Sequence, residues 1–315
     1  MSSVVSEIKS VGVVGLGLLG HGIAQAAAQT GNYKVIGIDS SDSMLDQAKN
    51  NIEGSVRKLN ERLVVKKVMS AEEADGHLNR TMDNLSFSTD TRALEHVDLV
   101  IEAIVEDMDV KKKLFKELGT FVKPSGILAS NTSSLRIGPM AEASGRPDRV
   151  VGLHYFNPVQ LMKLVEFVST DTTEKSIPET MRTFVENCGK TVVDCKDTPG
   201  FVVNRLLVPY IASAIAMAER KDASIPDIDI AMRLGASNPM GPLTLADYVG
   251  LDTTLNILKG WKKEYPDEPT FFVPKALELK VAKGKLGRKS GEGFYHWGDG
   301  TNSTKPTGFS GLEEE

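Results

Sequence analysis

The feature that most constrains the fold of this chain is a glycine motif placed between two apolar segments. The sequence GLGLLG at residues 15–20 follows a valine-rich run at 11–14 and precedes an alanine-rich stretch at 21–29. A second apolar run, at 34–38, ends at an acidic residue, Asp39. A strand, this glycine spacing, a helix and an acidic residue about 20 positions further on predict a βαβ unit that binds a dinucleotide.

Each glycine of the motif has a predicted task. Gly15 is expected to make the tight turn, Gly17 to let the backbone come close to a pyrophosphate, and Gly20 to let the helix pack closely on the strand. The N-terminus of the helix would add N–H donors and partial positive charge. The loop predicted to bind the cofactor consists of Gly15, Leu16, Gly17, Leu18, Leu19 and Gly20.

Asp39 predicts which dinucleotide is bound. Its carboxylate is expected to accept hydrogen bonds from the adenosine ribose hydroxyls and to repel a 2′-phosphate, which favours NAD over NADP. A glycine-rich turn followed by a helix-capping aspartate is the structural alternative. The strand before the motif and the helix after it favour the dinucleotide.

The first 195 residues alternate between short β-branched runs and longer amphipathic segments, which predicts an α/β domain. Such alternation indicates a Rossmann-like, doubly wound sheet with helices on both faces. The predicted strands are 11–15, 34–38, 97–104, 126–130, 149–154, 164–168 and 191–195. The predicted helices are 19–30, 43–69, 110–122 and 177–188. Residues 44–67 are too long for an average crossover helix, so we expect a helical excursion out of the sheet.

The pattern changes at residues 197–200, DTPG, and predicts a second domain. From 201 to 284 the apolar residues recur at helical spacing, and no strand pattern intervenes. We therefore predict an NAD-binding domain at 1–199 and an all-helical C-terminal domain at 200–297. The polar segment 298–315 is predicted to be a disordered tail.

Composition excludes several classes of function. The net charge of −5 over 315 residues argues against a general nucleic-acid binder, which needs a basic excess. Cys188 and Cys195 have no CxxC spacing and the five histidines lie far apart, so we expect no metal and no disulfide framework. No run of 18 apolar residues is present, which predicts no membrane span.

A histidine and a glutamate stand out as a possible catalytic pair. His154 ends the predicted strand VVGLH, and Glu166 lies in the next strand, KLVEFVS, after a turn at Asn157. If the two strands fold back on each other, the carboxylate can orient the imidazole and stabilise its protonated form. Histidine suits the removal of a hydroxyl proton because its ordinary pKa is about 6.5. Spacing alone leaves a structural role for both residues open.

Two polar loci could complete such a site. The sequence SNTSS at 130–134 follows a buried strand, at the carboxyl edge where doubly wound sheets bind ligands. Asn204 lies at the start of the first predicted helix of the second domain, and we expect it to face a cleft between the domains. A helix cap and a surface amide are the structural alternatives, and the sequence does not decide between them.

Taken together, these segments resemble the short-chain L-3-hydroxyacyl-CoA dehydrogenase family of fatty-acid β-oxidation. The combination of HYFNP, a glutamate twelve residues after the histidine, and DTPGFVVNR is highly specific. The similar segments, which run from Val11 to Tyr295, are GLGLLGHGIAQAAAQTG, DLVIEAIVEDMDVKKKLF, ASNTSSL, GLHYFNPVQLMKLVE, KDTPGFVVNRLLVPY, ERKDAS, NPMGPLTLADYVGLDTT and GRKSGEGFY.

The resemblance implies a role for each matching residue. The implied catalytic residues are His154 as general base, Glu166 as its partner, and Ser133 and Asn204 on the substrate oxygen. The implied cofactor residues are the 15–20 loop, Asp39, Glu106, Lys111, Ser133 and Lys289. The implied acyl-CoA residues are Ser55, Arg62, Ser133 and Asn157. Arg62 stands where the family has a lysine, and arginine keeps the charge and can bind phosphate through two hydrogen bonds.

The reaction implied by the resemblance is NAD-dependent oxidation of an (S)-3-hydroxyacyl-CoA to the 3-ketoacyl-CoA. The family resemblance also implies a homodimer formed by the helical domain, and the mitochondrial matrix as compartment, with the cytoplasm as alternative. One rival function is a λ-crystallin-type sugar-acid dehydrogenase acting on gulonate, which shares the fold and the HxxNP motif. The other is an NAD-binding protein without catalytic activity.

Overall fold

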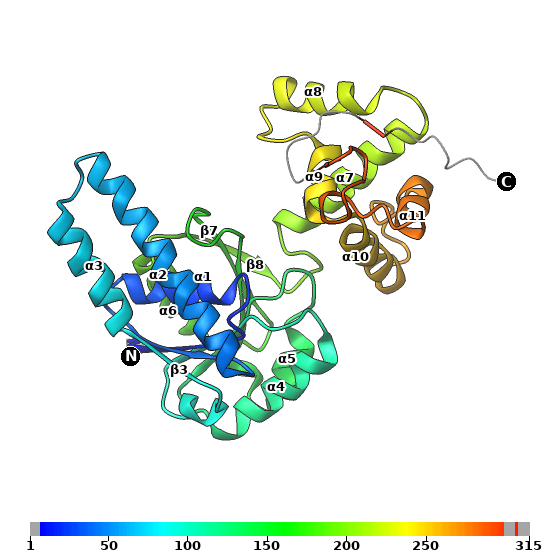
Figure 1. Ribbon diagram of the computed structural model, residues 1–315. Helices are drawn as coiled ribbons and strands as arrows, with labels where there is room; N and C mark the ends of the chain where they lie inside the picture. The colour runs from blue at the N-terminus through cyan, green and yellow to red at the C-terminus, as the bar shows by residue number, and fades with distance from the viewer. Residues whose placement is uncertain (1–6, 299–305, 308–315) are drawn as a thin grey trace. The chain divides into compact units, whose positions relative to one another are not determined.

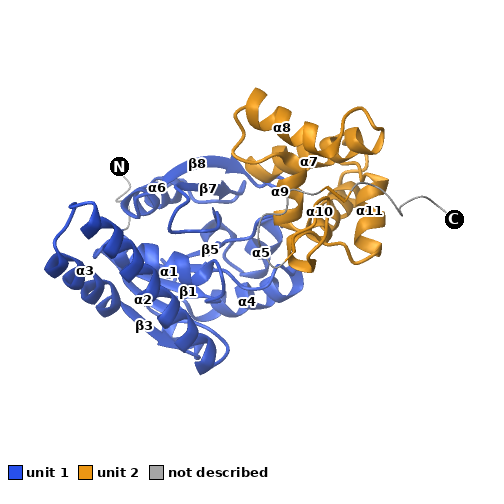
Figure 2. Ribbon diagram, turned by 45° about the horizontal axis from the view of Figure 1, so that its top comes forward, with its two compact units in different colours: residues 1–201 blue, residues 202–315 orange. Residues whose placement is uncertain are grey.

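The computed structural model describes residues 7–298 and 306–307. The chain divides into two compact units, residues 1–201 and residues 202–315, drawn in different colours in Figure 2. The first unit contains the sheet, and the helices of the second unit enclose a hydrophobic core of their own. Each unit is therefore described by itself.

The first unit is built on an eight-stranded sheet with the order β3-β2-β1-β4-β5-β6-β7-β8. Its strands are β1 (Ser10–Val14), β2 (Lys34–Ile38), β3 (Leu85–Ser88), β4 (Leu99–Glu102), β5 (Ile127–Ser130), β6 (Val150–Tyr155), β7 (Leu164–Ser169) and β8 (Thr191–Lys196). All neighbouring strands pair in parallel except β6 and β7, which are antiparallel. The strand order reverses between β1 and β4, which is where doubly wound sheets bind ligands.

Helices cover both faces of this sheet, so its central strands are apolar on both sides. On one face α1 (Gly20–Gln29), packed on β1 and β2, and α6 (Ile177–Asn187), packed on β7 and β8, share one hydrophobic cluster with Leu99 and Ile101 of β4. On the other face α4 (Met108–Phe121) and α5 (Gly138–Ala143) pack over Val100 of the same strand. The predicted Rossmann-like, doubly wound sheet is confirmed, and burial on both faces explains its continuous apolar strands.

The helical excursion is a hairpin of two helices and not the single helix predicted at 43–69. In Figure 1 its helices, α2 (Asp42–Val65) and α3 (Ala71–Asp83), lie side by side and project from the sheet. Ser70 begins α3, because its hydroxyl accepts from the N–H of Glu73 while the Glu73 carboxylate accepts from the N–H of Ser70. This capping box begins the second helix, whereas the first helix ends at Val65, two residues before Lys67 adopts a left-handed φ of +58°.

Other elements differ from the sequence prediction because they are short. Strand β3 has four residues, and the 3₁₀ helices η1 (Thr91–Leu94) and η2 (Pro147–Arg149) form single turns. Such elements carry too few residues for a periodic pattern to stand out. The strand predicted at 97–104 is also too long, since β4 ends at Glu102 and residues 103–107 turn into α4.

The second unit contains helices and, in its described residues, no strand longer than an isolated bridge. Its helices are α7 (Val203–Glu219), α8 (Ile225–Gly235), α9 (Pro242–Val249), α10 (Leu251–Glu264), α11 (Lys275–Ala282) and the 3₁₀ helix η3 (Arg288–Ser290). They enclose a core that includes Ile215, Leu243, Leu258 and Phe294. The predicted all-helical domain is confirmed, although α9 had no separate prediction.

Most of the tail predicted at 298–315 lies outside the described residues. Pro306 and Thr307 are described, and disorder of the tail stays a prediction. The Thr307 N–H donates to the Phe294 carbonyl at 2.9 Å, and the Lys280 ammonium donates to the Thr307 hydroxyl at 3.1 Å. Among the described residues, no helix has the length and apolar character needed to cross a bilayer.

Candidate active site

The glycine loop after β1 has the backbone shape that dinucleotide binding requires. Gly15 has a φ of +88°, in the left-handed region that favours glycine. A Cβ on Gly20 would lie 1.7 Å from the Gly15 carbonyl oxygen, so only glycine lets α1 pack this closely on the loop. A Cβ on Gly17 would meet no atom within 4 Å, which leaves space there for a ligand to approach the backbone. These three observations fit the residues to NAD.

Asp39 follows β2 at the same edge of the sheet and has a contact that the sequence did not predict. Its Oδ2 accepts from the Leu16 N–H at 2.7 Å, and its Oδ1 accepts from the Ser40 N–H at 2.7 Å. The carboxylate therefore holds the glycine loop as well as standing where a ribose is expected. A substitution that removes both carboxylate oxygens would change the loop and the proposed ligand contact together.

His154 and Glu166 are brought together by the antiparallel pairing of β6 and β7. They are directly opposite in the strand register, and His154 Nδ1 lies 2.7 Å from Glu166 Oε2. Both side chains are buried, at 4% and 0% exposure, and the imidazole packs against the rings of Phe156 and Phe201. With the Nδ1 proton donated to the carboxylate, Nε2 carries the lone pair that can take a proton.

Residues 132–134 of the SNTSS loop after β5 are held by the carboxylate of Glu106. Its Oε1 accepts from the Thr132 hydroxyl at 2.7 Å, from the Ser133 N–H at 2.9 Å and from the Ser134 N–H at 3.2 Å. The Ser133 and Ser134 hydroxyls contact the same oxygen at 3.3 and 3.2 Å. Burial disfavours the charge of Glu106, but Lys111 and these donors outweigh it and lower the pKa of the carboxyl group.

The same loop is joined to the strand of His154. The side-chain oxygen of Asn131 accepts from the Tyr155 N–H at 2.8 Å, and Asn131 is buried. Tyr155 directly follows His154, so this hydrogen bond ties the Ser133 loop to the residue beside the imidazole. The sequence placed Asn131 in a polar cluster but did not single it out.

Lys111 lies deeper than the sequence indicated. It is 1% exposed, and its ammonium lies 2.5 Å from Glu102 Oε1 and 3.3 Å from Glu106 Oε2. Glu102 is fully buried and was missed by the sequence prediction. An acidic residue that ends an apolar run, here LVIE, is the same signal that identified Asp39, and it could have identified Glu102.

The residues predicted to contact acyl-CoA lie on α2 and after β6. Ser55 and Arg62 are seven residues apart on α2, which places them on one face of the helix, two turns apart. Arg62 is exposed and Ser55 is half-buried. Asn157 is exposed on the segment after β6, three residues beyond His154.

The two remaining predicted residues belong to the second unit. Asn204 is the second residue of α7, and Lys289 lies in η3. The Lys289 ammonium forms an ion pair with Asp252 at 2.6 Å, which the sequence did not predict. Nearby charges and hydrogen bonds outweigh desolvation and lower the pKa of Asp252. The roles of Asn204 and Lys289 remain predictions.

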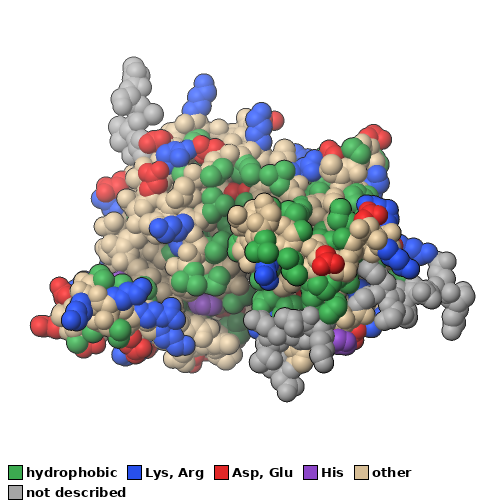
Figure 3. Space-filling view, turned by 90° about the horizontal axis from the view of Figure 1, so that it is seen from above, with side chains coloured by type: hydrophobic (Ala, Val, Ile, Leu, Met, Phe, Trp, Pro, Cys, Tyr) green, Lys and Arg blue, Asp and Glu red, His purple; other side chains and the backbone are tan. Residues whose placement is uncertain are grey.

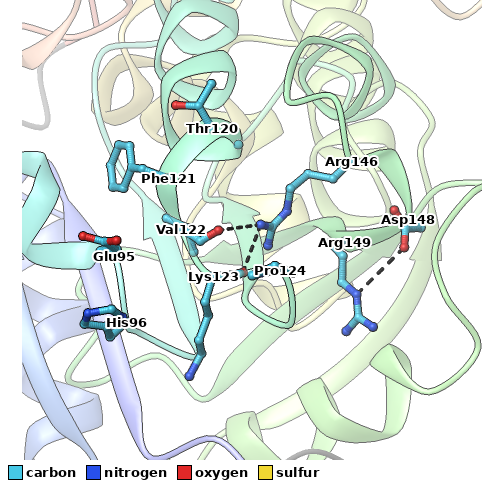
Figure 4. A pocket seen from close by; sticks show the side chains of 11 residues that line it. Glu95, His96, Thr120, Phe121, Val122, Lys123, Pro124, Arg146, Asp148 and Arg149 are labelled. Atoms are coloured by element: carbon cyan, nitrogen blue, oxygen red, sulfur yellow. Dashed lines mark hydrogen bonds and ion pairs between the residues drawn. The ribbon is translucent and has the colours of Figure 1, made fainter.

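A cavity of about 650 Å³ lies at the amino ends of β5 and β6, away from the carboxyl ends that carry the candidate site (Figure 4). Its basic side chains are already engaged. The Arg146 guanidinium donates to the carbonyls of Val122 and Lys123 at 2.8 and 3.0 Å, and Arg149 pairs with Asp148. These contacts satisfy carbonyl groups at the C-terminal end of α4. The cavity lies at the amino ends of β5 and β6, whereas His154 lies near the carboxyl end of β6, so the cavity is separate from the candidate site.

Comparison with known proteins assigns both halves of the chain to one family. Residues 10–198 match the family model described as "3-hydroxyacyl-CoA dehydrogenase, NAD binding domain", and residues 200–297 match "3-hydroxyacyl-CoA dehydrogenase, C-terminal domain". The chain is 48% identical over 291 residues to the rat protein named "Hydroxyacyl-coenzyme A dehydrogenase, mitochondrial", covering 92% of this chain and 91% of that one.

Bacterial proteins are similar as well. The Deinococcus radiodurans protein named "Probable 3-hydroxybutyryl-CoA dehydrogenase" is 44% identical, covering 91% of this chain and 99% of the relative. The crystal structure of (S)-3-hydroxybutyryl-CoA dehydrogenase from Ralstonia eutropha has a TM-score of 0.86 and 36% identity, covering 92% of this chain and 99% of that chain. With both family models and relatives of this identity matching nearly its whole length, the chain belongs to the 3-hydroxyacyl-CoA dehydrogenase family.

Proposed function

We propose that this chain oxidises the hydroxyl group of an (S)-3-hydroxyacyl-CoA to the 3-ketoacyl-CoA, with His154 as the general base. The observation that carries the proposal is the buried pair of His154 and Glu166, 2.7 Å apart at the carboxyl end of β6. Family membership and the names of the relatives supply the substrate class.

The proposed chemistry begins with the removal of a proton. NAD⁺, when bound, supplies the acceptor for the hydride that leaves the substrate carbon. His154 takes the hydroxyl proton on Nε2, since its Nδ1 proton is held by Glu166. Glu166 fixes the tautomer and the orientation of the ring, and its charge stabilises the imidazolium that forms. Burial of both side chains strengthens that interaction because water does not screen it.

The remaining predicted residues are proposed to bind and orient the substrate and NAD. Ser133 and Asn204 would keep the substrate oxygen within hydrogen-bond reach as it becomes a ketone. The proposed contacts to acyl-CoA are Ser55, Arg62, Ser133 and Asn157. The proposed contacts to NAD are the 15–20 loop, Asp39, Glu106, Lys111, Ser133 and Lys289.

Of the two predicted domains, 1–199 is proposed to bind NAD and 200–297 to form the dimer. Figure 3 looks down on the side of the second unit that carries α8, and hydrophobic side chains gather there. Leu206 and Met217 lie eleven residues apart on α7, and Ile230 and Leu234 lie four apart on α8, so each pair shares a helix face. All four side chains are exposed, Leu234 by 75%, and apolar faces of this kind favour a homodimer.

Light scattering coupled to size exclusion tests the dimer. The wild-type chain is expected at twice its monomer mass of 34.1 kDa, and Leu234→Glu is expected to shift the mass toward one copy. Val65→Glu, at an exposed position of α2 in the first unit, is the matched control. A wild-type monomer at micromolar concentration would contradict the proposal.

The compartment follows the names of the relatives. The rat relative is named as mitochondrial, whereas the Deinococcus relative is bacterial, so the fold serves in both settings. We propose the mitochondrial matrix. A full-length chain with a C-terminal fluorescent tag is expected to coincide with a matrix marker in eukaryotic cells, and a diffuse cytoplasmic signal would point to the alternative.

Activity is tested by following NADH oxidation at 340 nm with acetoacetyl-CoA, since the reaction is reversible. Rapid oxidation with NADH, little with NADPH, and none in the His154→Ala variant are the expected results. A folded, NADH-binding protein that leaves acetoacetyl-CoA unchanged but oxidises gulonate with NAD⁺ would establish the sugar-acid dehydrogenase instead. Inactivity toward both substrates would support a non-catalytic NAD-binding protein.

A further inference from the structure

A chain of charged side chains, of which Glu102 and Lys111 are buried and Glu106 is partly exposed, leads from the end of β4 to the loop that carries Ser133. Glu102, the last residue of β4, is fully buried, and its Oε1 accepts from the Lys111 ammonium at 2.5 Å. The same ammonium lies 3.3 Å from Oε2 of Glu106. The other oxygen of Glu106 accepts from the hydroxyl and amide donors of residues 132–134.

A second, shorter connection joins Glu102 to the same loop. Glu102 Oε2 accepts from the Ser130 hydroxyl at 2.6 Å, and the Ser130 oxygen accepts from the Thr132 N–H at 3.2 Å. Both Ser130 and Thr132 are fully buried. Both oxygens of Glu102 therefore face groups that lead to the SNTSS loop, one through Lys111 and Glu106 and one through Ser130.

The charges in this chain explain why Glu102 is needed. Two carboxylates share one buried ammonium, and the ammonium lies closer to Glu102 than to Glu106. Without the charge of Glu102, Lys111 would keep only Glu106 as an ionic partner, because a buried cation needs a close counter-charge. The ammonium would then draw the Glu106 carboxylate toward itself and away from the donors of the loop.

We propose that Glu102 is a positioning residue for the dehydrogenase reaction. Its carboxylate keeps the Lys111 ammonium buried beside it. Glu106 then continues to accept hydrogen bonds from the loop and keeps Ser133 in place. This inference rests on the proposed role of Ser133 at the substrate oxygen and the cofactor. Glu102 itself needs no contact with either ligand. It acts through Lys111, Glu106 and Ser130.

The test compares Glu102→Gln with Asp98→Asn in the full-length enzyme. Asp98 directly precedes β4, and it too is a carboxylate that accepts from a lysine, Lys123 at 2.6 Å, and from a serine hydroxyl, Ser10 at 2.8 Å. Both substitutions remove the charge of a carboxylate that pairs with a lysine and a serine at one end of β4, and the Asp98 pair is partly exposed whereas the Glu102 pair is buried. Thermal midpoint, the Kd for NADH from its fluorescence, and kcat and KM with acetoacetyl-CoA are measured for each variant.

A positioning role predicts a difference that stability alone does not produce. Both variants are expected to lower the thermal midpoint. Glu102→Gln is expected to lower kcat by about 10-fold to 100-fold and to raise the Kd for NADH, because small displacements of a positioning group cost this much. Asp98→Asn is expected to keep kcat and Kd within about twofold of the wild-type values, since it acts on stability alone. Equal kcat and Kd values in the two variants would overturn the proposal.

Two further measurements distinguish failure of this proposal from misfolding of the variant and from failure of the proposed function. If Glu102→Gln does not fold, Ser130→Ala removes one of the two connections without removing a buried charge, and the proposal predicts the same direction of change at a smaller size. Unchanged kcat and Kd in that variant would then overturn it. Wild-type inactivity toward acetoacetyl-CoA would instead refute the proposed function, and with it the assigned role of Ser133.

Discussion

His154 and Glu166 face each other as directly opposed residues of two antiparallel strands, so the backbone pairing of β6 with β7 sets the distance between imidazole and carboxylate. Their atoms Nδ1 and Oε2 are 2.7 Å apart, and the residues are 12 positions apart in the chain. A short antiparallel connection is the simplest way to bring two side chains at this separation face to face. The geometry of the proposed catalytic pair is therefore part of the sheet itself.

Glu166→Gln is expected to lower kcat by about 10²-fold to 10⁴-fold while NADH binding stays intact, because the base loses the charge that stabilises its protonated form. The measurement is steady-state oxidation of NADH with acetoacetyl-CoA, together with a fluorescence titration of NADH. Asp194→Asn, which removes an exposed carboxylate on the neighbouring strand β8, is the control and should keep full activity. Full activity in Glu166→Gln would remove the carboxylate from the mechanism.

Asp39 is expected to have two separable effects. Asp39→Ala removes both the ribose acceptor and the acceptor for the Leu16 N–H, so it should weaken NADH binding and narrow the preference over NADPH. Asp39→Asn keeps an oxygen that can accept from Leu16 and removes the charge that repels a 2′-phosphate. Asp39→Asn should reduce the preference for NADH over NADPH and cause a smaller loss of NADH affinity than Asp39→Ala. NADPH binding that stays negligible in both variants would show that another group excludes the phosphate.

Asp247 is expected to make stability depend on pH. Burial raises the pKa of this carboxyl group to about 6, although it accepts from the N–H groups of Phe294 and Tyr295 and from the Trp297 indole. A raised pKa means that the folded state holds the proton more tightly than the unfolded state, whose aspartates titrate near 3.9. This contribution to stability is full below about pH 4 and is lost as the pH rises to about 6.

The measurement for Asp247 is the thermal midpoint of the wild type and of Asp247→Asn between pH 4 and pH 7. Wild-type stability relative to the variant should fall by about 2 kcal/mol between pH 4 and pH 7, from a pKa difference of about two units. Subtracting the stability of the variant from that of the wild type at each pH cancels the contribution of the other titrating groups. A difference that does not change with pH would contradict the raised pKa.

Arg146 is expected to matter for stability and not for catalysis. Its guanidinium donates to the carbonyls of Val122 and Lys123 at the end of α4, at the sheet edge opposite His154. Arg146→Ala should destabilise the first unit by about 1–3 kcal/mol, since charged donors to buried carbonyls are lost. Thermal unfolding measures the loss, and an unchanged KM for acetoacetyl-CoA is the companion result. A raised KM would mean that the cavity beside Arg146 contributes to substrate binding.

The sequence by itself determined the family, the doubly wound sheet and the position of the glycine loop proposed to bind NAD. GLGLLG lies between a strand and a helix with Asp39 at the end of the next strand, and these local signals need only neighbouring residues to be recognised. Family membership, the NAD-binding domain and the dehydrogenase class are confirmed by both family models and by the relatives. Residue roles taken from the resemblance, including those of Ser133 and Asn204, remain predictions.

The tertiary structure decided what depends on residues far apart in the chain. Whether His154 meets Glu166 depended on antiparallel pairing, which the alternation of apolar residues does not specify. The partners of Lys111 depended on burial, because Glu102 and Lys111 become neighbours only when α4 packs on the end of β4. Likewise, Asp247 contacts Trp297 across 50 residues of sequence. Local patterns determine which elements form, whereas buried polar partners are chosen by packing, because a charge removed from water needs a partner wherever the fold brings one.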